Sequence, residues 1–188
     1  MHNLEPFYNW RAYYKSEEDE KSPFFKMVYN EYELSETIYN YYIHPNWDSI
    51  GSHTLYVKIL YTNYAEGYAI IELFGEWNDC LHNDIMFLKR NVIDELIHHG
   101  INKFILIGEN ILNFHYSDEC YYEEWYDELE EGWIILLNFR EHVLAEMKKG
   151  KIDYYFLIGK NLNSLSWRTY LPTQLFKIVN NWVVRQLP

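Results

Sequence analysis

From about residue 52 onward, the hydrophobic positions alternate between a strand pattern and a helix pattern. Two mainly apolar segments, Leu55–Tyr61 and Tyr68–Phe74, are separated by the short link Asn63–Gly67, which predicts a β-hairpin. The period then changes, because apolar residues between positions 85 and 97 recur at helical spacing. We expect Asn83 to cap the start of this helix and Gly100 to end it.

Three units in which a helix leads through a glycine into a strand follow one another along the chain. Their predicted strands are Phe104–Ile107, Trp133–Leu137 and Tyr154–Ile158. Nearly continuous apolar strands separated by helices are typical of a parallel sheet covered on both faces. We therefore predict an α/β domain over residues 51–188, with a mostly parallel sheet, the hairpin as its antiparallel edge and helices on both faces. A last helix, from about Pro172 to Leu187, is expected to cap it.

Residues 1–50 do not follow this rhythm and are predicted to form a helical, aromatic N-terminal extension. Of the first 47 residues, 13 are aromatic, which favours packing against the α/β body over disorder. Ser22 and Pro23 are expected to start a helix through Leu34, and residues 35–43 to form a second helix that Pro45 stops. The alternative is a small separate subdomain.

One motif occurs twice, at Phe104–Asn110 and at Tyr155–Asn161, as aromatic-x-Leu-Ile-Gly-charged-Asn. Each copy is predicted to lie where a strand ends, and open parallel sheets bind ligands at the carboxyl ends of their strands. The alternative is that the glycine and asparagine only let the chain turn. The candidate residues for a small anionic ligand at this edge are Glu109, Asn110, Lys160, Asn161 and Arg168.

The segment from 118 to 131 is strongly acidic, with eight carboxylates and no basic residue. Its aromatic residues recur at helical spacing, so one interpretation is an ordinary amphipathic helix with a solvated acidic face. The other is a recognition surface for a basic partner protein, because aromatic rings surrounded by carboxylates suit such a partner. The residues of this predicted partner-binding helix are Tyr122, Glu123, Glu124, Trp125, Tyr126, Asp127 and Glu128.

The order of the predicted elements over residues 55–187 resembles that of the STAS domain, the anti-sigma-factor-antagonist fold of bacterial partner switching. The local passage that most resembles this family is 99–107, where a helix leads through Gly100 into a strand. In that family a following loop carries an Asp-Ser-Ser-Gly-like motif with a phosphorylated Ser or Thr. Ser117 stands at the corresponding place, although the glycine and the preceding aspartate of the motif are missing. The resemblance implies a protein-binding regulatory module with Ser117 as a phosphorylation site, and the alternative role of Ser117 is a helix N-cap.

Charge and composition narrow the function classes. Sixteen basic residues against 28 acidic ones leave a net charge of −12, so nonspecific binding to nucleic acid is not expected. The charge is unevenly placed, because residues 1–132 carry −17 and residues 133–188 carry +5, which leaves room for one anionic ligand near the C-terminal part. No apolar run exceeds five residues, so no membrane helix is expected. With two cysteines and no visible secretion signal, we expect a cytoplasmic protein.

The sequence shows no motif for metal, phosphate or nucleophilic chemistry. It lacks a His-Glu-x-x-His or Cys-x-x-Cys pair, a glycine-rich phosphate loop and a Gly-x-Ser-x-Gly elbow. We therefore expect no cofactor and no metal, and we favour a non-catalytic protein-binding module of STAS-like type. The alternatives are a small-ligand-binding protein or enzyme with its site at the strand ends, and an acidic immunity or nucleic-acid-mimic protein. A homodimer is a further alternative, which an exposed aromatic patch would favour.

Overall fold

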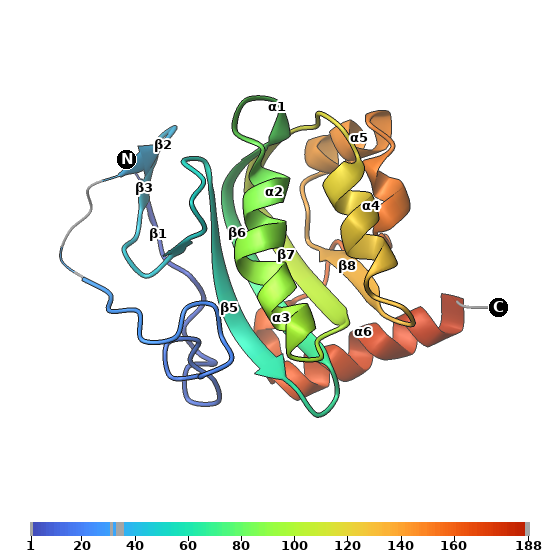
Figure 1. Ribbon diagram of the computed structural model, residues 1–188, viewed down its shortest axis with the longest axis horizontal. Coiled ribbons are helices and arrows are strands. Elements are labelled where there is room, and N and C mark those ends of the chain that lie inside the picture. Colours follow the sequence, from blue (N-terminus) through green and yellow to red (C-terminus); the bar gives the residue numbers. More distant parts are fainter. Residues whose placement is uncertain (1, 31, 33–35, 187–188) are drawn as a thin grey trace.

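The computed structural model describes residues 2–30, 32 and 36–186 and contains a central five-stranded sheet with helices on both faces (Figure 1). The strand order is β4-β5-β6-β7-β8, in which β4, β5 and β6 are antiparallel neighbours and β6, β7 and β8 are parallel. This confirms the α/β prediction and the hairpin of β5 and β6. The strands are β4 Asp48–Ser49, β5 Leu55–Asn63, β6 Tyr68–Asn78, β7 Lys103–His115 and β8 Trp133–Leu137.

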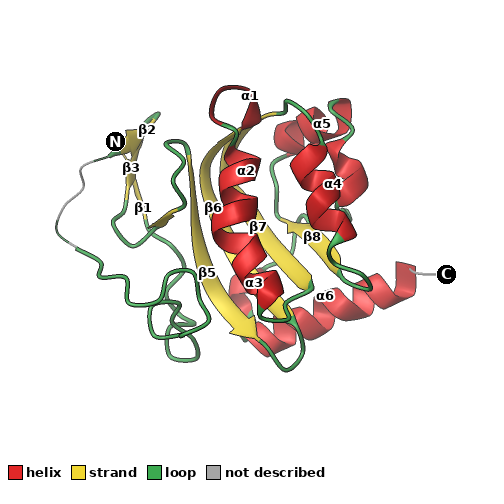
Figure 2. Cartoon of the chain, in the orientation of Figure 1, coloured by secondary structure: helices red, strands yellow, loops and turns green. Residues whose placement is uncertain are grey.

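Helices lie on each face of the sheet (Figure 2). A separate apolar core fills the space between each face and the helices on it. Side chains of successive strand residues point to opposite faces, so Ile71 and Leu106 belong to one core while Ile70 and Ile105 belong to the other. On the first face lie α1 Asp79–His82, α2 Asp84–Leu88, the π-helical turn η1 Lys89–Ile93, α3 Asp94–His98, α4 Cys120–Asp127 and α5 Glu141–Lys149. On the second face lies α6 Pro172–Gln186, whereas Leu187 is outside the described residues. No helix in the described ranges is long and apolar enough to cross a membrane.

The helical segment that was predicted to begin at Asn83 begins differently in the structure. Asn83 does not cap with its side chain but adopts a left-handed conformation, with φ of 54°, between α1 and α2. The side chain that caps is that of Asn78, which accepts a hydrogen bond from the N–H of Leu81 at 3.0 Å. Gly100 ends α3 with φ of 88°, as expected for a glycine after a helix.

The predicted third parallel strand at Tyr154–Ile158 is mostly wrong. Residues Ile152–Tyr155 form the 3₁₀ turn η2 instead, and only Leu157 pairs with β8, in register with Ile135. The tyrosines of η2 pack toward α4, because the Tyr155 ring lies 6.3 Å from the ring of Tyr122. These tertiary contacts outweigh the strand preference of an apolar run. A further 3₁₀ turn, η3 Trp167–Thr169, precedes α6.

The prediction of a helical N-terminal extension is also wrong for the described residues. Residues 5–30 follow turns and irregular chain, and three short strands form a second sheet of order β1-β3-β2. The predicted boundary between two helices, at Leu34 and Ser35, lies outside the described residues. The strands of this sheet are β1 His2–Leu4, β2 Thr37–Ile38 and β3 Tyr41–Ile43, and the nearby β4 pairs with the central sheet.

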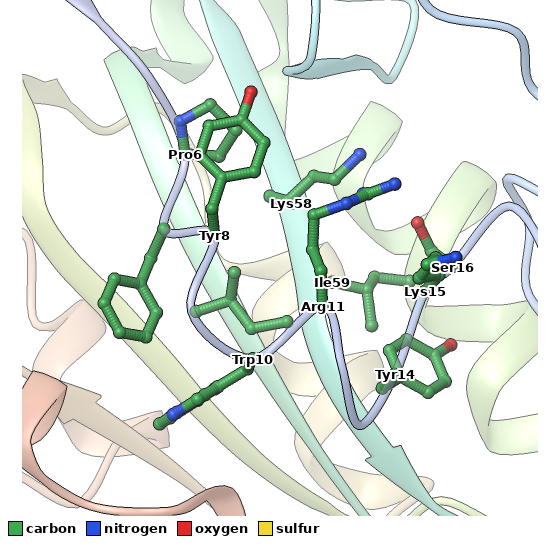
Figure 3. Close-up of a pocket in the computed structure, with 11 residues that line it drawn as sticks. Pro6, Tyr8, Trp10, Arg11, Tyr14, Lys15, Ser16, Lys58 and Ile59 are labelled. Atoms are coloured by element: carbon green, nitrogen blue, oxygen red, sulfur yellow. The ribbon is translucent and has the colours of Figure 1, made fainter.

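Individual long-range contacts fix the residues around Trp10 on the second face of the sheet, whereas Phe24 belongs to the core of the first face. The indole N–H of Trp10 donates to the Tyr170 carbonyl at 3.0 Å, and Trp10 belongs to the same core as α6. Figure 3 shows the segment passing over β5, where it encloses a cavity of about 10 Å³ next to Ser16 and Lys58. That volume is close to the space of one water molecule. Because the side chains of this segment find their partners in the rest of the protein, the segment follows the sheet surface and forms no helix of its own.

Lys58 forms a buried ion pair below this segment. Its Nζ lies 3.2 Å from Oδ2 of Asp48 and 3.9 Å from the centre of the Tyr29 ring. Burial raises the pKa of Asp48 and lowers the pKa of Lys58, while the opposite charge of each partner counteracts the shift. The pair thus joins β4 to β5 at a desolvated site.

Candidate functional site

Three of the residues predicted at the strand ends meet around a buried carboxylate of β6, that of Glu72. Its Oε2 accepts a hydrogen bond from the N–H of Phe7 at 2.8 Å, and its Oε1 accepts one from Nδ2 of Asn110 at 3.3 Å. The guanidinium of Arg168 lies 3.6 Å from Glu72 and also forms an ion pair with Glu109. The sequence prediction omitted Glu72, although a lone carboxylate within an apolar strand run was a visible signal.

Glu109 and Asn110 do not lie at the end of their strand, which corrects the prediction. Strand β7 continues to His115, and its pairing with β6 is irregular beyond Glu72. However, β8 pairs with β7 only as far as Leu137, and beyond it Arg140 donates to the Glu109 carbonyl of β7 at 3.1 Å. Gly108 is needed at this point, because a Cβ there would lie 2.3 Å from the ring of Phe139.

The electrostatics of this cluster do not favour an anionic ligand. Burial raises the pKa of Glu72 to about 7, although the Phe7 N–H and Arg168 favour its ionised form. An open pocket of about 390 Å³ lies beside Glu109 and Arg168. An anion entering it would meet the single guanidinium already shared between two carboxylates. The cluster instead connects the N-terminal segment, the sheet and the chain before α6.

Lys160 and Asn161, the other two predicted residues, are not part of this cluster. Both are exposed in the turn after Ile158. Lys160 borders a different pocket, of about 580 Å³, which Arg140 and Leu144 of the α5 region also line. The second copy of the sequence motif fails to form the same structure because its strand is reduced to a single bridging residue, Leu157.

The acidic helix α4 buries two of the three aromatic residues that were predicted to face a partner. Tyr122 and Trp125 are fully buried in the first core, so their assignment to a recognition surface is wrong. The Tyr122 hydroxyl donates to Oδ2 of Asp79 at 2.6 Å, and burial raises the pKa of this phenol well above its ordinary value. Burial likewise raises the pKa of Asp79 to about 7. Tyr122 and Trp125 therefore mark the core-facing side of α4, whereas Tyr126 lies on its outward side.

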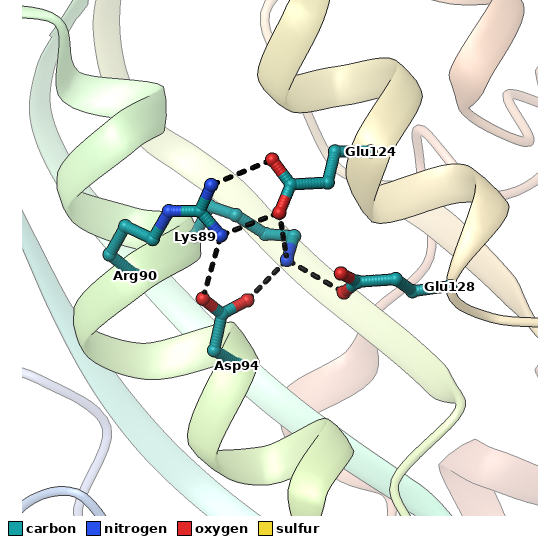
Figure 4. Close-up of polar contacts among 5 residues, drawn as sticks. All are labelled: Lys89, Arg90, Asp94, Glu124 and Glu128. Atoms are coloured by element: carbon teal, nitrogen blue, oxygen red, sulfur yellow. Dashed lines mark hydrogen bonds and ion pairs between the residues drawn. The ribbon is translucent and has the colours of Figure 1, made fainter.

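Two carboxylates, Glu124 of α4 and Glu128 directly after it, are neutralised within the molecule by a network that the sequence did not predict (Figure 4). The Nζ of Lys89, at the start of η1, is buried and lies 2.7 Å from Glu128 and 3.6 Å from Glu124. The Arg90 guanidinium donates two hydrogen bonds to Glu124, at 2.5 and 2.7 Å. Asp94 completes the network by pairing with both cations. These contacts hold α4 against η1 and α3 and remove Glu124 and Glu128 from the free acidic surface.

The outward side of α4 is different, since tyrosine rings and unpaired carboxylates meet there. Tyr126 is 47% exposed and Tyr154 of η2 is 75% exposed, and their ring centres lie 6.2 Å apart. Tyr155 lies within 6.0 Å of Tyr126 and donates its hydroxyl to Glu119 at 3.0 Å. Among the described residues, no cation pairs with the nearby carboxylates of Glu123, Asp127, Glu130 and Glu131. We call the set of Glu123, Tyr126, Asp127, Glu130, Glu131 and Tyr154 the acidic tyrosine surface.

A groove opens beside this surface. It has a volume of about 530 Å³ and lies between the end of α4, the first residues of β8 and η2. Tyr126, Tyr154 and Trp133 contribute to its walls, together with Glu130 and Glu131. The groove therefore combines aromatic walls with an acidic rim.

Ser117 and the remaining reactive side chains form no recognisable centre. Ser117 is exposed but does not cap α4, which begins at Cys120, and it donates a hydrogen bond to Asp118 at 3.2 Å. Cys80 and Cys120 are free thiols. Within the described part of the chain, no group of three or more His, Cys, Asp or Glu side chains is arranged to hold a metal ion.

Comparisons with known proteins give limited similarity. No protein-family model and no curated protein sequence matches the chain. Among solved structures, the chain is similar to a "putative anti-sigma factor antagonist" from Thermotoga maritima, with 16% sequence identity and a TM-score of 0.40. The similarity covers 54% of this chain and 82% of the other.

Proposed function

We propose that the protein is a non-catalytic regulatory module, of the STAS-like type expected from its element order, that binds a basic partner protein through the acidic tyrosine surface. The observation that supports this proposal is the contrast between the two sides of α4. Glu124 and Glu128 are neutralised by Lys89 and Arg90, whereas Glu123 and Asp127 pair with no cation in the described residues. The chain thus leaves acidic groups uncompensated where aromatic rings are exposed.

The chemistry of this surface suits lysine and arginine side chains. Tyrosine rings attract cations over their faces, and such contacts strengthen when water is excluded from them. Unpaired carboxylates complement a basic surface and accelerate its encounter by long-range attraction. The internal network around Lys89 holds α4 in place before binding, so less conformational freedom is lost on association.

The other functions considered from the sequence are less well supported. An anionic ligand at Arg168 would have to compete with Glu72 and Glu109 for one guanidinium. An acidic immunity or nucleic-acid-mimic protein would use the same acidic tyrosine surface, and its partner would also be basic. A symmetric homodimer through this surface would place like charges opposite each other, which is unfavourable. For the compartment we propose the cytoplasm, where the free thiols of Cys80 and Cys120 stay reduced.

The test uses charge reversal on the surface with a matched control elsewhere. The first variant combines Glu123→Lys with Asp127→Lys, and the control combines Glu20→Lys with Glu66→Lys, which makes the same charge change at exposed positions outside α4. The probe is a capped peptide of alternating arginine and valine, and binding is measured by isothermal titration calorimetry at two salt concentrations. We expect salt-sensitive binding by the wild type and the control, and at least tenfold weaker binding by the surface variant.

Two results would contradict the proposal. One is equal weakening in the control and the surface variant, which would indicate only a general effect of net charge. The other is the absence of peptide binding by the wild type at low salt, where electrostatic attraction is strongest. Far-UV circular dichroism and thermal unfolding of each variant verify that the fold is retained.

A further inference from the structure

Three tyrosine rings meet at the groove beside the acidic tyrosine surface. The ring centres of Tyr126 and Tyr154 lie 6.2 Å apart, those of Tyr126 and Tyr155 lie 6.0 Å apart, and those of Tyr154 and Tyr155 lie 5.4 Å apart. The ring planes are inclined to one another by 46° to 88°. Because a tyrosine ring attracts a positive charge within about 6 Å of its centre, a cation placed between two of these rings is attracted by both.

The three rings differ in how firmly they are held. Tyr155 is buried and its hydroxyl donates to Glu119 at 3.0 Å, so this ring is a fixed part of the wall. Tyr126 and Tyr154 also line the groove, but both are exposed. Aromatic surface is therefore accessible to a ligand without any change in the fold.

The charge and the hydrogen-bonding groups of the groove restrict the ligand further. Among the described residues that line it, Glu130 and Glu131 are exposed carboxylates, and none is a lysine, arginine, histidine, asparagine or glutamine. A primary ammonium or a guanidinium carries several N–H groups, which lose water on entering the groove and find few fixed acceptors in its aromatic part. A quaternary ammonium has no N–H group, so aromatic rings and negative charge are sufficient to hold it.

We infer that the groove binds a trimethylated lysine of the basic partner, with the quaternary ammonium group against the rings of Tyr126 and Tyr154. This inference rests on the proposed function and specifies the side chain that the partner inserts. A lysine within a peptide suits the site better than a free small cation, because the exposed carboxylates of Glu123 and Asp127 extend the acidic surface beyond the groove. Basic neighbours of the modified lysine can pair with these carboxylates.

The experiment compares three capped heptapeptides, Arg-Val-Arg-X-Arg-Val-Arg, by isothermal titration calorimetry. X is lysine, trimethyllysine or the neutral analogue of trimethyllysine, in which a tert-butyl group replaces the trimethylammonium group with little change of shape. We expect the trimethyllysine peptide to bind at least fivefold more tightly than either of the others, because it alone combines a positive charge with the absence of N–H groups. Tetramethylammonium chloride, titrated alone, represents a free cation and is expected to bind at least tenfold more weakly than the trimethyllysine peptide.

Variants of the protein test whether the rings supply this preference. Tyr154→Leu removes an exposed ring and is expected to reduce the preference for trimethyllysine over lysine at least threefold. Tyr154→Phe keeps the face of the ring and is expected to restore the preference. The matched control is Tyr13→Leu, which removes another exposed tyrosine that does not line the groove. An unchanged preference in Tyr154→Leu would overturn the assignment of the site to this groove.

The outcomes separate this inference from the proposed function. Equal affinity for the lysine and trimethyllysine peptides would overturn the inference while leaving binding to the acidic tyrosine surface intact. Equal affinity for the trimethyllysine peptide and its neutral analogue would also overturn it, because the groove would then recognise an apolar shape and not a charge. Tetramethylammonium binding as tight as that of the peptide would overturn lysine as the occupant and assign the groove to a free cation. Failure of all three peptides to bind would overturn both proposals.

Discussion

Replacing Glu72 by glutamine is expected to stabilise the protein, and to do so only above a defined pH. The carboxylate is buried on β6, where Oε2 accepts from the Phe7 N–H and Oε1 faces Asn110 and Arg168. A glutamine oxygen can accept the same Phe7 hydrogen bond, and Arg168 keeps its second partner, Glu109. The substitution therefore removes an ionisable group while preserving the shape of the side chain and the Phe7 hydrogen bond, and its NH2 group replaces the oxygen that faces Asn110 and Arg168.

The size of the effect follows from the shift in the pKa of Glu72. Burial raises it from 4.5 to about 7 in the folded state. Between these values the folded protein holds a proton that the unfolded chain has released, so the free energy of unfolding decreases as the pH rises through this window. At about 1.4 kcal/mol per pKa unit, the free energy of unfolding of the wild type falls by about 3 kcal/mol between pH 4 and pH 8 because of this residue. The Glu72→Gln variant cannot ionise and lacks this loss.

Urea unfolding of the wild type and the variant at several pH values between 4 and 8 measures this difference. The free energy of unfolding of the variant relative to the wild type should rise through the window and level off near pH 8. Other groups that titrate there, such as Asp79, occur in both proteins and cancel in the difference. A Glu66→Gln variant, at an exposed turn, controls for the loss of a carboxylate. A difference that stays constant over the whole range would refute the reasoning.

Three further predictions concern packing and buried charge, and unfolding in urea measures each one. Lys58→Met should lower the free energy of unfolding by about 3 to 5 kcal/mol, because it leaves the negative charge of the fully buried Asp48 without a partner. Lys89→Met should lower it by less, because water reaches the carboxylates around Lys89. Equal losses in the two variants would contradict this prediction. Gly108→Ala should destabilise by about 1 to 3 kcal/mol through its clash with the Phe139 ring, and Phe139→Leu should relieve part of that cost; a neutral Gly108→Ala would show that the ring moves freely. Trp125→Ala should lower the free energy of unfolding by about 3 to 5 kcal/mol, because Trp125 is a core residue. A small loss would show that Trp125 is not part of the core and would support its assignment to the recognition surface.

The sequence predicted the elements that depend on local periodicity. The hairpin, the helix that ends at Gly100 and the strand at Trp133–Leu137 all have a regular apolar pattern, and the structure confirms them. It also confirms helices on both faces of the sheet. The N-terminal segment could not be predicted in this way, because distant partners such as Tyr170 for Trp10 determine its path. Its strands of two or three residues are too short to produce a period.

In the candidate sites, too, local patterns predicted some residues, while distant contacts determined the rest. The repeated motif suggested Glu109 and Asn110, and positive charge suggested Arg168, but the carboxylate that joins them, Glu72, lies on a different strand, β6. Helical spacing on α4 identified an acidic, aromatic segment yet could not tell its buried side from its exposed side. That distinction depends on tertiary packing, which buries Tyr122 and Trp125 in the first core and brings Lys89 to Glu128.

The attachment of the N-terminal segment has a consequence for the order of folding. Phe7 is hydrogen-bonded to Glu72, 65 positions later in the sequence, and Trp10 is hydrogen-bonded to Tyr170, 160 positions later. Contacts between residues so distant in sequence form slowly, since a long loop must close before they stabilise anything. During synthesis the segment must wait until the chain around Tyr170 has emerged, while the second face of the sheet remains uncovered. Its apolar surface is then available to chaperones or to aggregation for longer than the first face, whose helices lie near their strands in sequence.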